Sequence, residues 1–378
     1  MIRVCHIISG LGTGGAEMML NNLAGRMDRT RFEPSVVSLV DRGTLGGRIE
    51  QAGVQVRVLG MKRGIPSPSG LFALRKILRE LRPDLIQGWM YHGNLAATLG
   101  AALLGGNVPV VWGIHHSLYD IAKERPLTRA VIRLCARLSH RPAATVYVSR
   151  LSATQHADFG FRAEGSLVIP NGFDCERFRP DPERGARLRR ELGIAADRVL
   201  IGLIARYHPM KDHGNFLRAA ARLAASRPEA QFLLTGTGVD SDNAELRGMA
   251  ESLGLSGRIG LLGERGDVAD LMTALDILCV SSSHGEAFPM VVGESMASGV
   301  PCAVTDVGDA AWMVGDTGRV APTRDAEALA AALAELVDLG AEGRRALGID
   351  ARQRIRDEFS LERSVAAYQS VYERRAGR

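Results

Sequence analysis

Two cations in the second half of the chain have residue types and a spacing suited to binding a diphosphate. Arg206 and Lys211 lie in the segment ARYHPMKDH, directly after the apolar run that ends in IGLI. Cations at the carboxyl end of a strand neutralise the charge that develops on a diphosphate when a sugar–phosphate bond breaks. Taken singly, each residue is equally consistent with an ordinary surface cation.

Two carboxylates further along the chain add a second kind of chemistry. Glu286 and Glu294 enclose the segment EAFPMVVGE, in which Pro289 fits the first turn of a helix. The backbone N–H groups at the start of that helix would bind an anion, and carboxylates accept hydrogen bonds from the hydroxyl groups of sugars and ribose. The alternatives are a helix-capping role for Glu286 and a solvated helix position for Glu294.

A glycine-rich segment, SGLGTGGAE, follows the first β-branched run. Gly10, Gly12 and Gly15 match the G-x-G-x-x-G pattern that brings a backbone close to a pyrophosphate, and Asp41 ends the next apolar run. This segment is the strongest indication in the sequence of a nicotinamide-dependent oxidoreductase. Asp41 lies 26 residues beyond Gly15, later than the usual spacing of about 20, so a tight turn without a ligand is the alternative.

Strands and helices must position these segments, and the sequence alternates short β-branched runs with amphipathic stretches. That alternation is typical of parallel sheets with crossover helices. The expected strands of the first half are Arg3–Ser9, Pro34–Val40, Gln55–Leu59, Asp84–Gln87, Val108–Ile114, Ala143–Val148 and Ser166–Ile169. Those of the second half are Arg198–Ala205, Ala230–Thr235, Arg258–Leu262, Asp276–Ser281, Val300–Thr305 and Gly318–Val320. A Pro-rich, charged stretch around Cys175 separates the two series, so we expect two domains, 1–175 and 176–378, with a ligand cleft between them.

Length and composition exclude several classes of protein. The 378 residues are 46% apolar and 24% charged, which argues against disordered, collagen-like and coiled-coil chains. Five cysteines without a C-x-x-C pair suggest neither disulfides nor a zinc site, as expected of a cytoplasmic protein. Residues 85–119 carry no Asp, Glu, Lys or Arg, but several glycines and Pro109 break the segment, so we reject a membrane-spanning helix.

Four motifs in order, GGAE, PNGFD, ARYHPMKDH and GEAFPMVVGE, resemble those of the family 4 retaining glycosyltransferases of GT-B fold. The resemblance runs along nearly the whole chain. It implies an α/β fold of two Rossmann-like domains facing each other across a cleft, with a C-terminal helix that crosses back to the first domain. It also implies transfer of a hexose from a nucleoside-diphosphate sugar, UDP or GDP, to a hydroxyl group, with no metal and no other cofactor.

The resemblance further implies roles for individual residues. Those expected to bind the donor are Gly14, Gly15, Arg206, Lys211, Thr235, Gly236, Gly238, Glu286, Phe288, Pro289, Met290, Val291 and Glu294. Arg206, Lys211 and Glu286 are also expected to be catalytic, with Glu286 holding the transferred sugar and Glu294 the ribose. In VWGIHHS, the family's acceptor-side catalytic histidine matches His115 better than His116. Asp309 stands where the family has a Glu-containing motif, so that contact is expected to differ.

The acceptor is expected to be a glycan or a polyprenyl-linked sugar of cell-surface polysaccharide synthesis. Residues 1–179 carry a net charge of +10 and residues 180–378 one of −5, which favours an anionic partner for the first half. Arginines recur at every fourth position of an amphipathic stretch: Arg125, Arg129, Arg133, Arg137 and Arg141. This pattern is typical either of an ordinary surface helix or of one that binds the inner face of a membrane. No aromatic platform accompanies these residues, so nucleic acid is not expected as a partner.

Three other classes of function fit parts of the pattern: a nucleotide-sugar epimerase, an NAD-dependent oxidoreductase that uses the Gly10, Gly12 and Gly15 segment, and a non-catalytic binding protein. No carboxylate is clearly placed as a covalent nucleophile, so for the transferase we expect front-face attack assisted by the leaving phosphate. The triplet Asp240-Ser241-Asp242 resembles a metal–nucleotide motif of other transferases, but we interpret it as a polar helix start.

Overall fold

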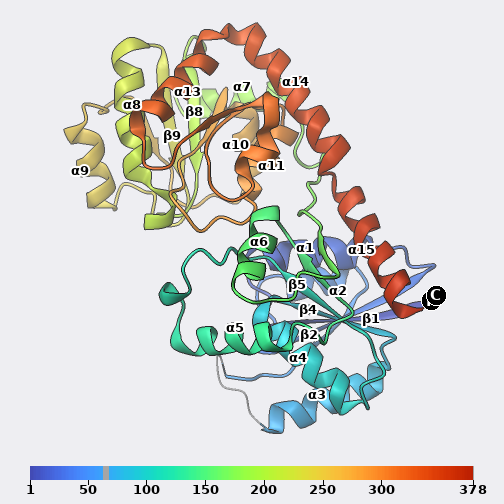
Figure 1. Cartoon of the computed structure of the whole chain (residues 1–378). Helices are drawn as coiled ribbons and strands as arrows, with labels where there is room; N and C mark the ends of the chain where they lie inside the picture. Colours follow the sequence, from blue (N-terminus) through green and yellow to red (C-terminus); the bar gives the residue numbers. More distant parts are fainter. Residues whose placement is uncertain (63–67, 378) are drawn as a thin grey trace. The chain divides into compact units, whose positions relative to one another are not determined.

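The computed structural model describes residues 1–62 and 68–377, which form two compact units (Figure 1). Unit 1 contains Met1–Gly172 and the segment from Leu361 onward, and unit 2 contains Phe173–Ser360. The sequence-based boundary near Cys175 therefore falls just inside unit 2. The expected range 176–378 for the second domain was too long, because the helix after Ser360 packs into the core of unit 1, as the resemblance implied.

Unit 1 is built on a seven-stranded sheet in which every pairing between the described strands is parallel. The strand order is β3-β2-β1-β4-β5-β6-β7. The strands are β1 (Ile2–Ile8), β2 (Phe32–Ser38), β3 (Gln55–Val58), β4 (Leu85–Trp89), β5 (Val110–Ile114), β6 (Ala144–Tyr147) and β7 (Ser166–Val168). Each lies within two residues of an expected strand. The order reverses between β1 and β4, which is where open sheets of this type bind ligands.

Helices cover both faces of this sheet (Figure 1). They are α1 (Gly15–Arg26), α2 (Gly46–Gln51), α3 (Pro68–Leu81), α4 (Met90–Leu103), the 3-10 turn η1 (Ile121–Lys123), α5 (Pro126–Leu138), α6 (Arg150–Asp158) and α15 (Leu361–Ala376). The central strands read as continuous apolar runs because both faces are buried; all five residues of β5, for example, are buried. From α15, Leu361, Val365, Tyr368 and Tyr372 join the same core as β1.

Unit 2 repeats the plan with a six-stranded sheet, ordered β10-β9-β8-β11-β12-β13, whose pairings are again parallel. Its strands are β8 (Val199–Ile204), β9 (Ala230–Thr235), β10 (Ile259–Leu261), β11 (Ile277–Val280), β12 (Cys302–Thr305) and β13 (Arg319–Ala321). The order reverses between β8 and β11. The second half of the expected linker is itself helical, since α7 spans Pro182–Glu191.

The remaining helices of unit 2 connect and cover these strands. They are the 3-10 turn η2 (Pro209–Lys211), α8 (His213–Ser226), α9 (Ala244–Ser252), α10 (Val268–Ala274), α11 (Met290–Ala297), α12 (Ala310–Val314), the 3-10 turn η3 (Gly315–Thr317), α13 (Ala326–Asp338) and α14 (Gly340–Glu358). The triplet 240–242 precedes α9, whose N-cap is Asn243. Within the described residues, no helix combines the length and apolar character needed to span a bilayer.

Candidate functional site

Lys211 and Glu286, which are 75 residues apart in the sequence, form an ion pair at the strand-order reversal of unit 2. Lys211 ends the turn after β8, and Glu286 lies in the loop after β11. Both side chains are largely buried, with exposed fractions of 18% and 11%. The hydroxyl of Ser282 also donates to the same Glu286 carboxylate oxygen at 2.8 Å. The structure thus brings together two predicted catalytic residues and adds Ser282, which the sequence analysis missed.

Backbone contacts hold these two loops together. The hydroxyl of Ser281 donates to the carbonyl of Lys211, and the N–H of Ser283 donates to the carbonyl of Met210, each at 2.8 Å. These bonds fix the position of Lys211 relative to Glu286. The SSS run after β11 was the available sequence signal, since small hydroxyl residues bond readily to nearby backbone groups.

Arg206 lies at the carboxyl end of β8 and is exposed. Within the described part of the chain, its guanidinium has no ion pair or hydrogen bond, so this charge is available to an anion. Gly236, with a φ of +145°, lets the end of β9 pass so close to β8 that a Cβ there would overlap the carbonyl of Ala205. At Gly238, with a φ of +75°, a Cβ would lie 3.3 Å from the Cβ of Tyr207. Both glycines support the segment that carries Arg206.

Thr235 differs from the expectation of direct donor contact. It is buried, with an exposed fraction of 2%, and its hydroxyl donates to the carbonyl of Gly263 at 2.5 Å. A side chain with these contacts stabilises the turn after β9. Residue types alone could not distinguish a buried threonine from an exposed one.

The start of α11 lies beside Glu286. Pro289 is the N-cap, and no side chain caps the helix. The ring of Phe288 is buried and stacks on Phe173, with ring centroids 6.0 Å apart. Only the backbone of Phe288 is therefore suited to a ligand, together with that of Met290 and Val291 in the first turn. A helix start without a side-chain cap is a suitable binding site for an anion.

Gly308, which precedes Asp309, lies close to the backbone of the loop that carries Glu286. Its φ is +63°, and a Cβ there would lie 2.6 Å from the carbonyl oxygen of Glu286 and 2.8 Å from that of Ala287. Asp309 is buried, and its N–H donates to the carbonyl of Ala287 at 3.2 Å. The segment after β12 therefore supports the backbone of the Glu286 loop from behind.

Glu294 is on the second turn of α11 and is only partly exposed. Burial raises the pKa of its carboxyl to about 7, although the positive charge of Arg177 acts in the opposite direction. Within the described residues, its carboxylate accepts no hydrogen bond. A carboxylate that is desolvated but unpaired is costly for the fold, which is common where a side chain is kept for a ligand.

Gly14 and Gly15 differ in their surroundings at the start of α1. A Cβ at Gly14 would overlap the carboxylate of Glu17, which folds back over it, whereas a Cβ at Gly15 would lie 3.9 Å from Asn171. Burial raises the pKa of Glu17. An anion could approach Gly14 only if the carboxylate of Glu17 moved away or was protonated. Gly15 is accordingly the more open of the two predicted contacts.

His115 follows β5 and is enclosed by aromatic rings. Its imidazole stacks on Trp89 with centroids 5.0 Å apart, and its Nε2 lies 3.4 Å from the hydroxyl of Tyr368 on α15. Burial lowers the pKa of His115 to about 4, so the ring is neutral at pH 7. The Nδ1 atom is inaccessible to solvent. No sequence signal linked Tyr368 to a histidine 253 positions away.

The arginine-rich stretch is a shorter helix than its sequence period suggested. α5 spans Pro126–Leu138, so Arg125 is its N-cap residue and Arg141 lies beyond its end. Its buried residues are Val131, Ile132 and Cys135. Leu127 and Leu134 lie outside the buried face, with exposed fractions of 44% and 40%. Arg133 and Arg137 share the exposed face with them.

Each unit also matches a protein-family model. Residues 13–177 match the model described as Glycosyltransferase Family 4, and residues 186–354 match that of Glycosyl transferases group 1. A D-inositol 3-phosphate glycosyltransferase of Corynebacterium jeikeium is 32% identical over 95% of this chain and 91% of its own. The chain belongs to the family 4 and group 1 glycosyltransferases. The oxidoreductase and epimerase alternatives are therefore not supported.

Other relatives of this glycosyltransferase agree with the assignment. EpsF of Bacillus subtilis, named as a glycosyltransferase, is 27% identical over 80% of this chain and 79% of its own. Alignments with several further D-inositol 3-phosphate glycosyltransferases span only 43–50% of those proteins.

A solved structure with the same fold is that of Alr3699/HepE of Anabaena in complex with UDP. Its TM-score is 0.85 at 23% sequence identity, over 98% of this chain and 99% of that one. The same protein has also been solved with UDP and glucose and with UDP-glucose. This similarity confirms the expected GT-B fold with two Rossmann-like units.

Proposed function

We propose that this glycosyltransferase moves a hexose from a UDP- or GDP-sugar to a hydroxyl of a glycan or lipid-linked acceptor, with retained anomeric configuration and without a metal. The observation that carries the proposal is the Lys211–Glu286 pair at the strand-order reversal of unit 2, together with the exposed Arg206 at the end of β8. The complexes of Alr3699/HepE with UDP and UDP-glucose support the choice of donor class.

In this proposal each group has one task. Arg206, Lys211 and the start of α11 neutralise the departing diphosphate, which gains charge as the bond to the anomeric carbon breaks. Glu286 accepts hydrogen bonds from the hexose hydroxyls, and Glu294 accepts them from the ribose. Because Glu286 is engaged by Lys211 and Ser282, we favour attack by the acceptor on the face that the diphosphate leaves over attack by this carboxylate.

Calorimetry with UDP, GDP and their hexose conjugates tests the donor, and a turnover assay tests Lys211. Lys211→Ala should lower turnover by about 10²–10³-fold, the usual cost of removing one group that stabilises developing negative charge. Lys211→Gln keeps a hydrogen-bond donor for Glu286 and separates loss of charge from loss of packing. Arg187→Ala, an exposed arginine of α7, is the matched control. Near-normal turnover in both Lys211 variants would contradict the proposal.

We also propose that the exposed face of α5 binds anionic membrane lipid, so that unit 1 reaches a polyprenyl-linked acceptor. Arg133 and Arg137 beside the exposed Leu127 and Leu134 give this face both charge and apolar surface, a combination typical of interfacial helices. Removing Arg129, Arg133 and Arg137 together should weaken co-sedimentation with acidic vesicles, at about 1 kcal/mol per arginine. Equal binding of the unaltered protein to neutral vesicles would refute the electrostatic model.

A further inference from the structure

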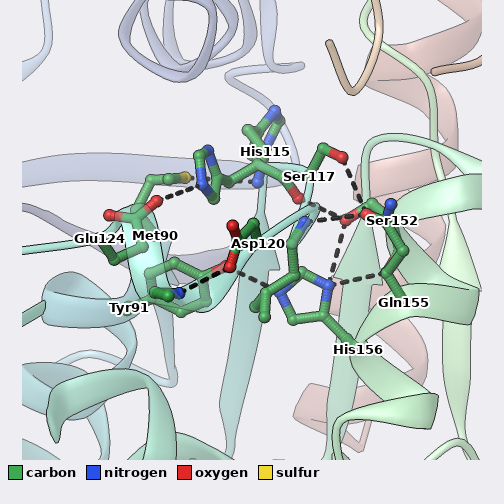
Figure 2. Close-up of polar contacts among 12 residues, drawn as sticks. Met90, Tyr91, His115, Ser117, Asp120, Glu124, Ser152, Gln155 and His156 are labelled. Atoms are coloured by element: carbon green, nitrogen blue, oxygen red, sulfur yellow. Dashed lines mark hydrogen bonds and ion pairs between the residues drawn. The ribbon is translucent and has the colours of Figure 1, made fainter. Parts of the chain in front are cut away.

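A second histidine of unit 1, His116, is paired with a carboxylate at the carboxyl edge of the sheet. Its Nε2 lies 2.9 Å from Oε1 of Glu124, the residue that follows η1 (Figure 2). The two side chains are 35% and 28% exposed, so a ligand can reach them. His115, in contrast, has an inaccessible Nδ1 and a hydroxyl beside its Nε2.

The loop that carries His116 is fixed by bonds from α6. Oε1 of Gln155 accepts from both the hydroxyl of Ser117 and the N–H of Leu118, each at 2.8 Å (Figure 2). The hydroxyl of Ser152 donates to the carbonyl of His116 at 2.6 Å. A loop held at three successive residues presents its side chains in a defined position before any ligand arrives, which lowers the entropic cost of binding.

Buried groups beneath the loop support this arrangement. Nε2 of His156 accepts from the hydroxyl of Tyr91 at 2.8 Å, and its Nδ1 donates to the carbonyl of Ser152 at 2.7 Å (Figure 2). The ring of Tyr91 meets the imidazole of His116 edge to face, with centroids 6.1 Å apart. Hence α4, α6 and η1 each contact the His116 imidazole or the loop that carries it.

The carboxylate determines which imidazole nitrogen is available. Because the carboxylate of Glu124 is an acceptor, neutral His116 donates to it through Nε2–H, and Nδ1 then carries the lone pair. Within the described residues, Nδ1 of His116 has no hydrogen-bond partner. An exposed pair of this kind contributes little to stability, so its ordered geometry is better explained by a ligand than by folding.

We propose that the His116–Glu124 pair is a binding site for a hydroxyl of the acceptor, an inference that rests on the proposed glycosyltransferase function. The hydroxyl donates to Nδ1 of His116, and Glu124 holds the ring in the required tautomer and orientation. His116 touches the acceptor, whereas Glu124 is a positioning residue. The ligand is therefore a polyol, such as a sugar or a cyclitol, bound at the carboxyl edge next to β5.

The test compares three variants with a matched control. His116→Ala removes the acceptor nitrogen, His116→Asn restores an oxygen near the position of Nδ1, and Glu124→Gln keeps a hydrogen-bond acceptor without the charge. His140→Ala alters an exposed histidine that follows α5. Two quantities are measured for each: the calorimetric Kd for UDP and GDP, and the KM and kcat for transfer to a panel of methyl hexosides, N-acetylglucosamine and D-inositol 3-phosphate.

We expect His116→Ala to raise the acceptor KM about tenfold with the nucleotide Kd unchanged, and His116→Asn to recover most of the loss. Glu124→Gln should fall between these variants, and His140→Ala should match the unaltered protein. An unchanged acceptor KM in His116→Ala would overturn the inference. A second result would also overturn it: the unaltered protein binds nucleotide, but no polyol of the panel changes the NMR signals of the His116 ring. Failure to bind either nucleotide would instead refute the proposed function itself.

Discussion

Lys211 and Glu286 neutralise each other in the structure, so a donor that binds here must compete for both. A diphosphate would draw the ammonium group away from the carboxylate, and the hexose hydroxyls would take its place as partners of Glu286. Ser282, which also donates to Glu286, keeps the carboxylate in position during this exchange. The energetic cost of separating a buried ion pair is large unless both partners are satisfied again, so a free hexose, which offers no new partner to Lys211, should bind weakly.

Glu294 should show a conflict between stability and binding. The pKa of Glu294 is raised to about 7, so the folded state binds more protons than the unfolded state between about pH 4.5 and 7, and stability falls as pH rises through this window. At pH 8, Glu294→Gln should increase the free energy of unfolding by roughly 1–3 kcal/mol.

The same substitution should weaken UDP or GDP binding, because the neutral amide is a poorer acceptor for a ribose diol. Urea unfolding at pH 5 and pH 8, together with calorimetry, checks both effects. At pH 5 the stability gain should disappear. A variant that loses stability at pH 8 would show that the carboxylate is paired after all.

The two sites could be predicted from sequence to different extents. That Lys211, Glu286 and the helix at Pro289 lie near one another could be predicted because each motif follows an apolar strand, and a parallel sheet places such strand ends on one edge. Their direct pairing, and the pairing of His116 with Glu124, depends on loop conformation and on side-chain rotamers. Local residue types do not specify either pairing. For the same reason the contact between Tyr368 and His115 could not be predicted from the sequence.

α11 owes its position to a glycine. A Cβ at Gly293 would overlap the ring of Phe173, which is fully buried and stacked on Phe288. Gly293→Ala should therefore destabilise unit 2 by about 1–3 kcal/mol and shift the start of α11, with a matching loss of nucleotide affinity. Gly248, in the middle of α9, is exposed and has open space around it.

Gly248→Ala is the control for this prediction. It should stabilise the protein by about 0.5–1 kcal/mol, since alanine is the better helix former and meets no neighbour. Thermal unfolding of both variants, followed by circular dichroism, shows whether each substitution raises or lowers the stability of the protein. If the two alanine variants changed stability in the same direction, packing of α11 against Phe173 would not be the reason for Gly293.

The strands were predicted more accurately than the helix ends. Runs such as VVWGI in β5 are buried on both faces and therefore continuously apolar, a pattern with few alternatives. The arginine period suggested a helix over 125–141, but α5 begins at Pro126, where proline fits the first turn, and ends at Leu138. The buried face is centred on Ile132 and Cys135, so Leu127 and Leu134 fall at its exposed margins, which a simple four-residue period does not reveal.

Acid should destabilise the whole protein well above the pH at which carboxylates are protonated. Burial lowers the pKa of His6 to about 3 and that of His115, His156 and His213 to about 4. Between about pH 6.5 and 4 the unfolded chain binds more protons at these sites, so stability falls with pH. From pH 7.5 to 5 the expected loss is roughly 2 kcal/mol for each of these histidines, and their summed loss exceeds the opposite effect of Glu294.

Chemical denaturation at a series of pH values measures this loss. His140→Ala, which alters an exposed side chain, is the control variant. A free energy of unfolding that stays flat between pH 7.5 and 5 would show that these histidines are hydrated or protonated in the folded protein.

Unit 1 is interrupted in sequence by the 188 residues of unit 2, from Phe173 to Ser360, before α15 rejoins it. During translation at about 5–20 residues per second, α15 follows the rest of unit 1 out of the ribosome after roughly 10–40 s. Until then the apolar surface that Tyr368 and Tyr372 cover is bare. The later half of the nascent chain can therefore complete its core first, while the earlier half keeps apolar surface exposed for longer.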